Sequence, residues 1–197
     1  MNKNLCVAAF AVGLVAVCWV GIGYIGSHPL AFAMTAIIGT VYALGALELR
    51  RFQQATSSLT VALDAIPENL TNLGDWLAML HPSLQSPVRL RIEGERTALP
   101  GPAVTPYLVG LLVMLGMLGT FLGMVVTLNG AVLALESTTD LQTIRAALAT
   151  PVKGLGLAFG TSVAGVAASA MLGLISVLCR RERMQAGQSL DNRIATD

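Results

Sequence analysis

The sequence predicts an all-α integral membrane protein with four transmembrane helices, and three observations support this fold class. Hydrophobic residues make up 54% of the 197 residues, charged residues make up 12%, and the mean hydropathy is +0.70. About a quarter of the residues of a soluble domain are charged, so this composition indicates an integral membrane protein. No charged residue stands between Lys3 and Glu48, and two more long uncharged runs follow. The net charge of +1 indicates no nucleic-acid-binding surface.

The uncharged runs set the expected crossings. A helix rises about 1.5 Å per residue and the bilayer core is about 30 Å thick, so about 20 apolar residues span it once. Ser27-His28-Pro29 divides the first run into two such stretches. We therefore expect transmembrane helices near Leu5–Gly26, Leu30–Leu47, Val104–Leu135 and Gly154–Cys179.

Two threonine–proline pairs predict where the later helices begin. Thr105-Pro106 and Thr150-Pro151 favour helix starts at Pro106 and Pro151, because threonine caps a helix well and proline suits its first position. Between the last two crossings, the apolar residues of 136–150 gather on one side. This pattern predicts an amphipathic helix lying on the periplasmic membrane surface.

The distribution of Lys and Arg predicts the orientation. One group of connections is rich in these residues, whereas the connections on the other side hold only Arg145 and Lys153. By the positive-inside rule, both termini and the long middle segment are expected in the cytoplasm. The chain then divides into helices 1 and 2 (1–49), a cytoplasmic helical segment (50–103), helices 3 and 4 (104–179) and a cytoplasmic tail (180–197). The residues on the basic side are Lys3, Arg50, Arg51, Arg89, Arg91, Arg96, Arg180, Arg181, Arg183 and Arg193.

The middle segment shows helical periodicity but no motif for catalysis or for binding a nucleotide or metal. In the last part of this segment, an irregular return to the membrane is expected, with a short extended piece at Val88, Leu90 and Ile92. His81 is expected to be a solvated loop residue. No nucleotide loop, metal-ligand cluster or catalytic constellation is present in the sequence, so we expect neither an enzyme nor a bound cofactor or metal. Apolar residues recur at three- and four-residue steps at Phe52, Ala55, Leu59, Leu63 and Ile66, and again at Leu70, Leu73, Leu77 and Leu80.

Inside the predicted membrane helices, the polar groups are hydroxyls. The interiors of the four helices contain no Asp, Glu, Lys or Arg, so any ion relay needs a carboxylate from another chain. In helix 3, Thr120 and Thr127 are seven residues apart, which places them about 20° apart around the axis, on one face. Gly119 and Gly123 form a small-xxx-small pair, which favours close helix packing.

Helix 4 carries a second stripe of small residues. Gly156, Gly160, Ala164 and Ala168 follow one another at four-residue steps and form a groove for another backbone. Thr161 and Ser162 differ by about 100° around the axis and are expected to face different partners, with Ser162 in a packing stripe. For each hydroxyl taken alone, a bond to the carbonyl one turn back is the more ordinary interpretation; the presence of a threonine in a glycine-rich surface on both helices favours the ion path.

Two stretches resemble the MotA/TolQ/ExbB proton-channel family. The run Leu118-Gly119-Thr120-Phe121-Leu122-Gly123 after Pro106 is similar to the family's third helix. Pro151, followed ten residues later by a threonine that opens a small-residue run up to Ala168, is similar to its fourth helix. The resemblance covers residues 104–179 and the four-helix topology.

This resemblance implies a homopentamer, in the bacterial inner membrane, around two copies of a single-helix partner of the MotB/TolR/ExbD or OmpA-like type. The partner carries the ion-binding aspartate, and Thr120 and Thr161 match the two threonines that line the pore beside it. Gly156 stands where TolQ and ExbB have a glutamate, which leaves proton and sodium both open as the transported ion. The short middle segment ranks envelope maintenance, transport energisation and phage defence above motility. ZorA-like relatives have long helical tails, so the end at Asp197 fits a short member or a truncated one.

Two other function classes were weighed against this motor. A small four-helix exporter needs an acidic residue inside the membrane, and the sequence has none there. A passive membrane scaffold without conduction remains the alternative, since hydroxyls and small residues also serve packing alone.

Overall fold

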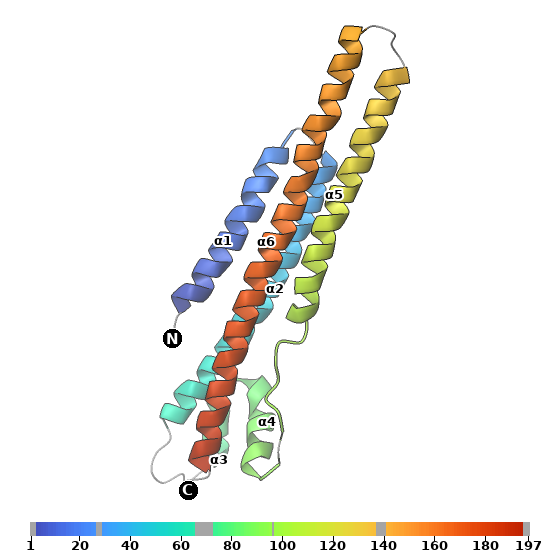
Figure 1. Ribbon diagram of the computed structural model, residues 1–197. Coiled ribbons are helices and arrows are strands. Elements are labelled where there is room, and N and C mark those ends of the chain that lie inside the picture. The colour runs from blue at the N-terminus through green and yellow to red at the C-terminus, as the bar shows by residue number, and fades with distance from the viewer. Residues whose placement is uncertain (1–2, 27–28, 66–72, 96, 137–140, 195–197) are drawn as a thin grey trace.

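The computed structural model describes residues 3–26, 29–65, 73–95, 97–136 and 141–194, and all regular structure in these ranges is helical. Four helices are long and apolar enough to cross a membrane, as the sequence predicts. They are α1 (Lys3–Tyr24), α2 (Pro29–Asp64), α5 (Thr105–Glu136) and α6 (Leu141–Ile194), with the short helices α3 (Leu73–Ala78) and α4 (Pro82–Ile92) between α2 and α5. In Figure 1 the four long helices run side by side, and α3 and α4 lie at the end of the bundle where α6 finishes.

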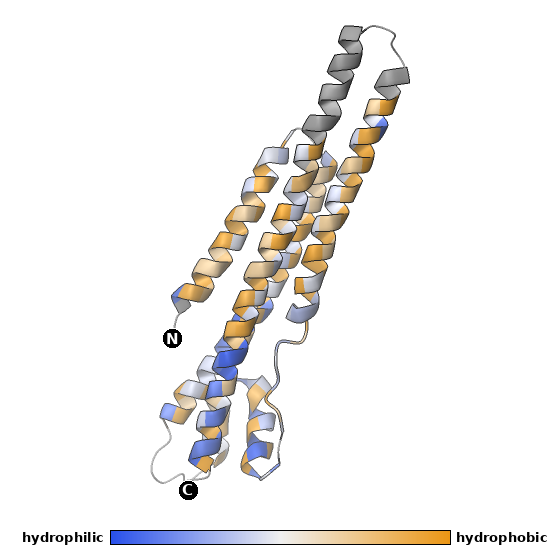
Figure 2. Ribbon diagram, viewed as in Figure 1, coloured by the Kyte–Doolittle hydropathy of each residue, from blue (hydrophilic) through white to orange (hydrophobic). Residues whose placement is uncertain are grey.

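Two of the long helices run well past their predicted ends. α2 continues from the predicted end at Leu47 to Asp64, and α6 continues from Cys179 to Ile194. These extensions form most of the polar end of the molecule in Figure 2. α6 thus continues through residues 180–194, which the sequence analysis assigned to the tail.

The prediction that a helix starts at Pro151 is wrong. α6 begins at Leu141 and passes through Pro151 without interruption. An internal proline removes one backbone hydrogen bond, but residues 142–149 contain no Gly or Pro to end the helix before it. The segment predicted to lie along the membrane surface is therefore continuous with α6 from Leu141 onward, while residues 137–140 lie outside the described residues.

The extended piece predicted after His81 is a helix instead. His81 is exposed, as expected, but it caps α4: its Nδ1 accepts a hydrogen bond from Ser83 N at 3.3 Å, and Pro82 takes the first helical position. Leu84 and Val88, one turn apart, are fully buried. Packing of this face outweighs the strand-like alternation of apolar residues and arginine over residues 88–92.

The described residues contain two hydrophobic cores, one above the other along α2 and α6. The membrane core is built around Ile38, Tyr42, Leu112 and Leu172. The lower core joins α2, α3, α4 and the end of α6, and its fully buried members include Leu59 and Leu84. It contains the predicted Ala55, Leu63 and Leu80 and also Trp76, whereas Leu73 is exposed, Phe52 and Leu77 are partly buried, and Ile66 and Leu70 lie outside the described residues.

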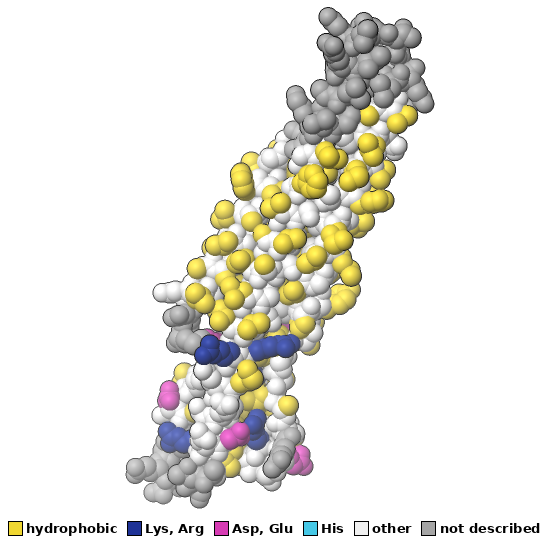
Figure 3. Space-filling model, in the orientation of Figure 1, with side chains coloured by type: hydrophobic (Ala, Val, Ile, Leu, Met, Phe, Trp, Pro, Cys, Tyr) yellow, Lys and Arg dark blue, Asp and Glu magenta, His cyan; other side chains and the backbone are white. Residues whose placement is uncertain are grey.

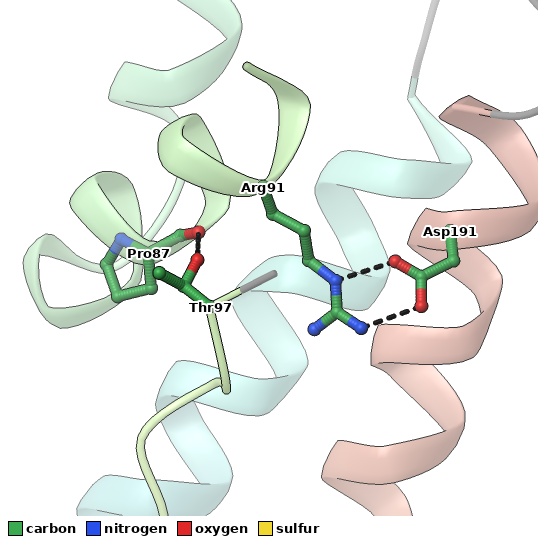
Figure 4. A network of polar contacts seen from close by, with 4 residues as sticks. All are labelled: Pro87, Arg91, Thr97 and Asp191. Carbon is green, nitrogen blue, oxygen red and sulfur yellow. Dashed lines mark hydrogen bonds and ion pairs between the residues drawn. The ribbon is translucent and has the colours of Figure 1, made fainter. Parts of the chain in front are cut away.

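Polar contacts connect α4 with the end of α6 and with the chain that follows α4. The Arg91 guanidinium on α4 donates two hydrogen bonds to the Asp191 carboxylate on α6, at 2.6 and 2.7 Å. Thr97, in the connection that follows, donates to the carbonyl oxygen of Pro87 (Figure 4). The chain between α4 and α5 is thereby tied to α4, and α4 is tied to α6.

Candidate functional site

The candidate site is the seam between α5 and α6, where glycines bring the two backbones into contact. A Cβ on Gly165 would lie 2.6 Å from the carbonyl oxygen of Leu112 and 2.7 Å from Gly116 Cα. These are backbone atoms of α5, so no side chain can move aside to make room. The sequence analysis did not single out Gly116 or Gly165; the spacing of Gly116, Gly119 and Gly123 along one face was the available signal.

The two predicted motifs meet in this seam. A Cβ on Gly119 would lie 2.7 Å from Thr161 Oγ1, and one on Gly123 would lie 2.8 Å from the Ala158 Cβ. Because the helices are antiparallel, the contacts run in opposite directions along the two sequences. The stretch 118–123 and the stretch beginning at Gly160 thus form one surface.

The three threonines of the predicted ion path have different surroundings. Thr161 has no exposed surface, and its Oγ1 donates to the Ala158 carbonyl at 2.9 Å. Thr120 and Thr127 are partly exposed and donate to the carbonyls of Gly116 and Gly123, at 3.1 and 2.6 Å. In the single chain, Thr120 and Thr127 therefore reach the surface at the edge of the seam, while Thr161 is enclosed within it.

The remaining predicted packing residues of α6 divide among several neighbours. The hydroxyl of Tyr24 on α1 packs against Gly160, so a Cβ on Gly160 would collide with that oxygen. Ala164 is fully buried, and the backbone of Ser162 lies against Gly116. Thr161 therefore contacts α5 through its side chain and Ser162 through its backbone, and the partner of the Ser162 side chain stays a prediction. A Cβ on Gly156 would meet nothing within 4 Å among the described residues.

A carboxylate of α2 positions the beginning of α5, where Thr105 precedes Pro106. The Glu48 carboxylate accepts hydrogen bonds from Val104 N at 2.9 Å and from Thr105 Oγ1 at 2.6 Å. Val104 immediately precedes the helix and Thr105 is its first residue, so the carboxylate holds the chain at the helix start. The sequence analysis assigned Glu48 no role, because its partner is distant in sequence.

One side of α5 remains uncovered in the single chain. Only 17% of its most apolar stretch is buried, against 44% for α6. Met114, Met117 and Phe121 are each more than half exposed. In a membrane this side faces lipid or another protein chain.

The seam offers hydroxyl oxygens and no charge. A hydroxyl that donates to its own helix still has lone pairs that accept a hydrogen bond or coordinate a cation. No group of three metal-ligating side chains occurs in the described part of the chain. No protein-family model, curated protein or solved structure matches this chain.

Proposed function

We propose that the chain is the channel-forming subunit of a 5:2 rotary motor in the bacterial inner membrane. Five copies, with both termini in the cytoplasm, surround two single-helix partners, each of which supplies an ion-binding aspartate. The observation that carries the proposal is the contact between Gly119 and Thr161, which joins the two family-like stretches in one seam. Thr120, the residue after Gly119, lies at the edge of that seam and is partly exposed.

The chemistry of the seam supports a neutral wall for an ion path. The oxygens of Thr120 and Thr127 keep acceptor capacity after donating to Gly116 and Gly123. A partner helix placed on the uncovered side of α5 would bring its carboxylate beside these oxygens. The charged site and the polar wall would then belong to different chains.

The energetics of such a path are adequate for work. An ion that crosses the membrane releases about 2.3 kcal/mol per charge per 100 mV. Protonation or sodium binding at the partner's aspartate removes its net charge and changes its affinity for the hydroxyl wall. Two aspartates inside a ring of five cannot both occupy equivalent positions, so alternating engagement produces stepwise rotation.

The exposure of the threonines makes the proposal testable residue by residue. Thr120→Val in the co-expressed complex is expected to lower proton or sodium flux into proteoliposomes at least about tenfold. The reason is that the ion in the path loses its interaction with the Thr120 hydroxyl, which is comparable in energy to one hydrogen bond. Thr161→Val tests the other threonine of the predicted path and is expected to lower flux less, because the Thr161 side chain is enclosed in the single chain. Equal flux from the parent and the Thr120→Val complex would contradict the assignment.

The assembly itself is tested by the mass of the purified complex. Five copies of this chain with two of a single-helix partner are expected; a monomer or dimer would reject the motor. A 5:2 complex that conducts neither ion under a membrane potential would favour the passive scaffold, for which the uncovered apolar side of α5 would serve equally well.

A further inference from the structure

Four exposed arginines lie where the apolar surface of the molecule ends. Arg50 and Arg51 are on α2, and Arg180 and Arg181 are on α6. Figure 3 shows Lys and Arg side chains side by side at the level below which the yellow surface becomes mixed with polar and charged side chains. We name these four residues the arginine belt.

Contacts between the helices place both pairs of the belt at one level. The guanidinium of Arg183, one turn beyond Arg180, lies 4.1 Å from the centre of the Phe52 ring and donates to the Phe52 carbonyl. Arg50 precedes Phe52 by two residues, and its guanidinium lies 5.3 Å from the centre of the Phe10 ring on α1. The belt therefore crosses α2 and α6 at the same depth.

The belt arginines differ from Arg89 and Arg91 of the lower region, which pair with protein carboxylates. Arg89 pairs with Glu93 at 2.8 Å, and Arg91 pairs with Asp191 at 2.6 Å. Within the described residues, none of the four belt arginines forms an ion pair.

The two nearest carboxylates in sequence do not supply one. Glu48 accepts its hydrogen bonds from the start of α5, and Glu182 forms no ion pair with any described residue. The positive charge of the belt is thus left for a ligand outside the chain.

We propose that the arginine belt binds the phosphate groups of anionic phospholipids in the adjacent leaflet. A guanidinium matches a phosphate with two parallel hydrogen bonds. Directly above the belt, exposed apolar side chains offer a surface for the acyl chains: Leu44 and Leu47 on α2, and Leu174 and Val177 on α6. A phospholipid fits both features at once, with its phosphate at the arginines and its chains on the leucines and valine.

The test is a lipid titration of the purified full-length chain in a neutral detergent. Bound dioleoyl phosphatidylglycerol is counted by native mass spectrometry and compared with dioleoyl phosphatidylcholine. We expect tighter binding of phosphatidylglycerol, and a loss of about fivefold in affinity for each arginine replaced, from about 1 kcal/mol per basic residue near an anionic surface. The pairs Arg50→Gln/Arg51→Gln and Arg180→Gln/Arg181→Gln are thus expected to lose roughly 30-fold each.

Two further variants separate lipid binding from general effects. The double variant Arg89→Gln/Arg193→Gln removes two exposed charges away from the belt and is expected to bind phosphatidylglycerol like the parent. A variant with all four belt residues changed to Lys retains the charge and is expected to keep most of the preference for the anionic lipid. If the Gln variants fail to fold, binding of the two lipids is compared with this Lys variant instead.

Three results would overturn the proposal. The first is equal binding of the two lipids by the parent chain, which requires no variant. The second is unchanged binding by folded Gln variants. The third is displacement of phosphatidylglycerol by millimolar inorganic phosphate, which would assign the belt to a free anion.

Discussion

The two halves of α6 differ in how closely they approach the helices they pack against. In the upper half, Gly165 and Ala158 meet α5 at backbone distance, and the buried Thr161 satisfies its hydroxyl within its own helix. In the lower half, below the arginine belt, Ala186 and Leu190 enter a core with Trp76 and Leu84. The upper half therefore combines close backbone contact with α5 and the buried Leu172 of the membrane core, whereas the lower half packs through its side chains.

The difference follows from the solvent at each end. Lipid tails are as apolar as leucine, so burying a large side chain against another helix gains little there, and close packing of small residues supplies the attraction. In water, burial of apolar surface is itself favourable by about 25 cal/mol per Å². The belt marks the level at which one kind of packing replaces the other.

A buried arginine is found only on the aqueous side of this boundary among the described residues. Arg183 is 5% exposed and donates to Thr56 Oγ1 at 2.9 Å, to the Pro100 carbonyl at 3.2 Å and to the Phe52 carbonyl at 3.3 Å. Its guanidinium also stacks on the Phe52 ring. These contacts join α2, α6 and the chain before α5, which links the lower core to the start of the seam.

The largest expected effect comes from adding one methyl group to the seam. Gly165→Ala places a Cβ against the α5 backbone and is expected to lower the free energy of unfolding by about 3 kcal/mol, the upper end of the range for overpacking. Gly173→Ala on the same helix is the control, because its Cβ would meet only Val109 Cγ1, at 3.8 Å. Thermal midpoints of the two purified variants in detergent measure the difference. If both lie at the parent's midpoint, the seam does not depend on backbone contact.

A smaller loss is expected on the aqueous side. Arg183→Ala removes three hydrogen bonds from a charged donor and is expected to destabilise the chain by about 2 kcal/mol. Limited proteolysis of the connection between α4 and α5 measures the effect, since Pro100 loses its partner. The exposed Arg193 is the control, and Arg193→Ala is expected to change stability by less than about 0.5 kcal/mol. Equal cleavage of the two variants would show that Arg183 does not hold the connection between α4 and α5 in place.

The smallest effect is expected at the ion pair of Figure 4. The side chains of Arg91 and Asp191 are 25% and 46% exposed, so water and salt screen their attraction. Asp191→Asn is expected to cost about 0.5 kcal/mol at low salt and almost nothing at 1 M NaCl. Denaturation at the two salt concentrations measures this, with Gln188→Ala, an exposed uncharged residue of the same helix, as control. A salt-independent loss would mean that the contact acts through packing.

Much of the membrane part could be predicted because lipid imposes simple requirements. Every backbone polar group must be paired inside the bilayer, so a long uncharged run predicts a helix directly. The runs after Lys3 and before Glu136 indeed correspond to α1, α2 and α5. The start of α6 was misjudged at Pro151, because a local preference of proline was weighted above the helical tendency of the residues before it.

The aqueous part was predicted less well because its elements depend on distant neighbours. The alternation in residues 88–92 suggests an extended piece, and only the burial of Leu84 and Val88 against the other helices explains the helix α4. Trp76 was missed for the same reason: its indole on α3 donates to the Ala62 carbonyl on α2 at 2.8 Å.

The sequence by itself determined the apolar composition, the four helices long enough to cross a membrane and the small-residue faces, because composition and helical spacing are local properties. Tertiary structure alone decided which small residues meet: that Gly165 lies against Gly116, that Thr161 is enclosed while Thr120 is partly exposed, and that Tyr24 occupies the notch at Gly160. Spacing gives the face of a helix on which a residue lies, but not the neighbour that covers it. That neighbour depends on how several helices share the space around α6.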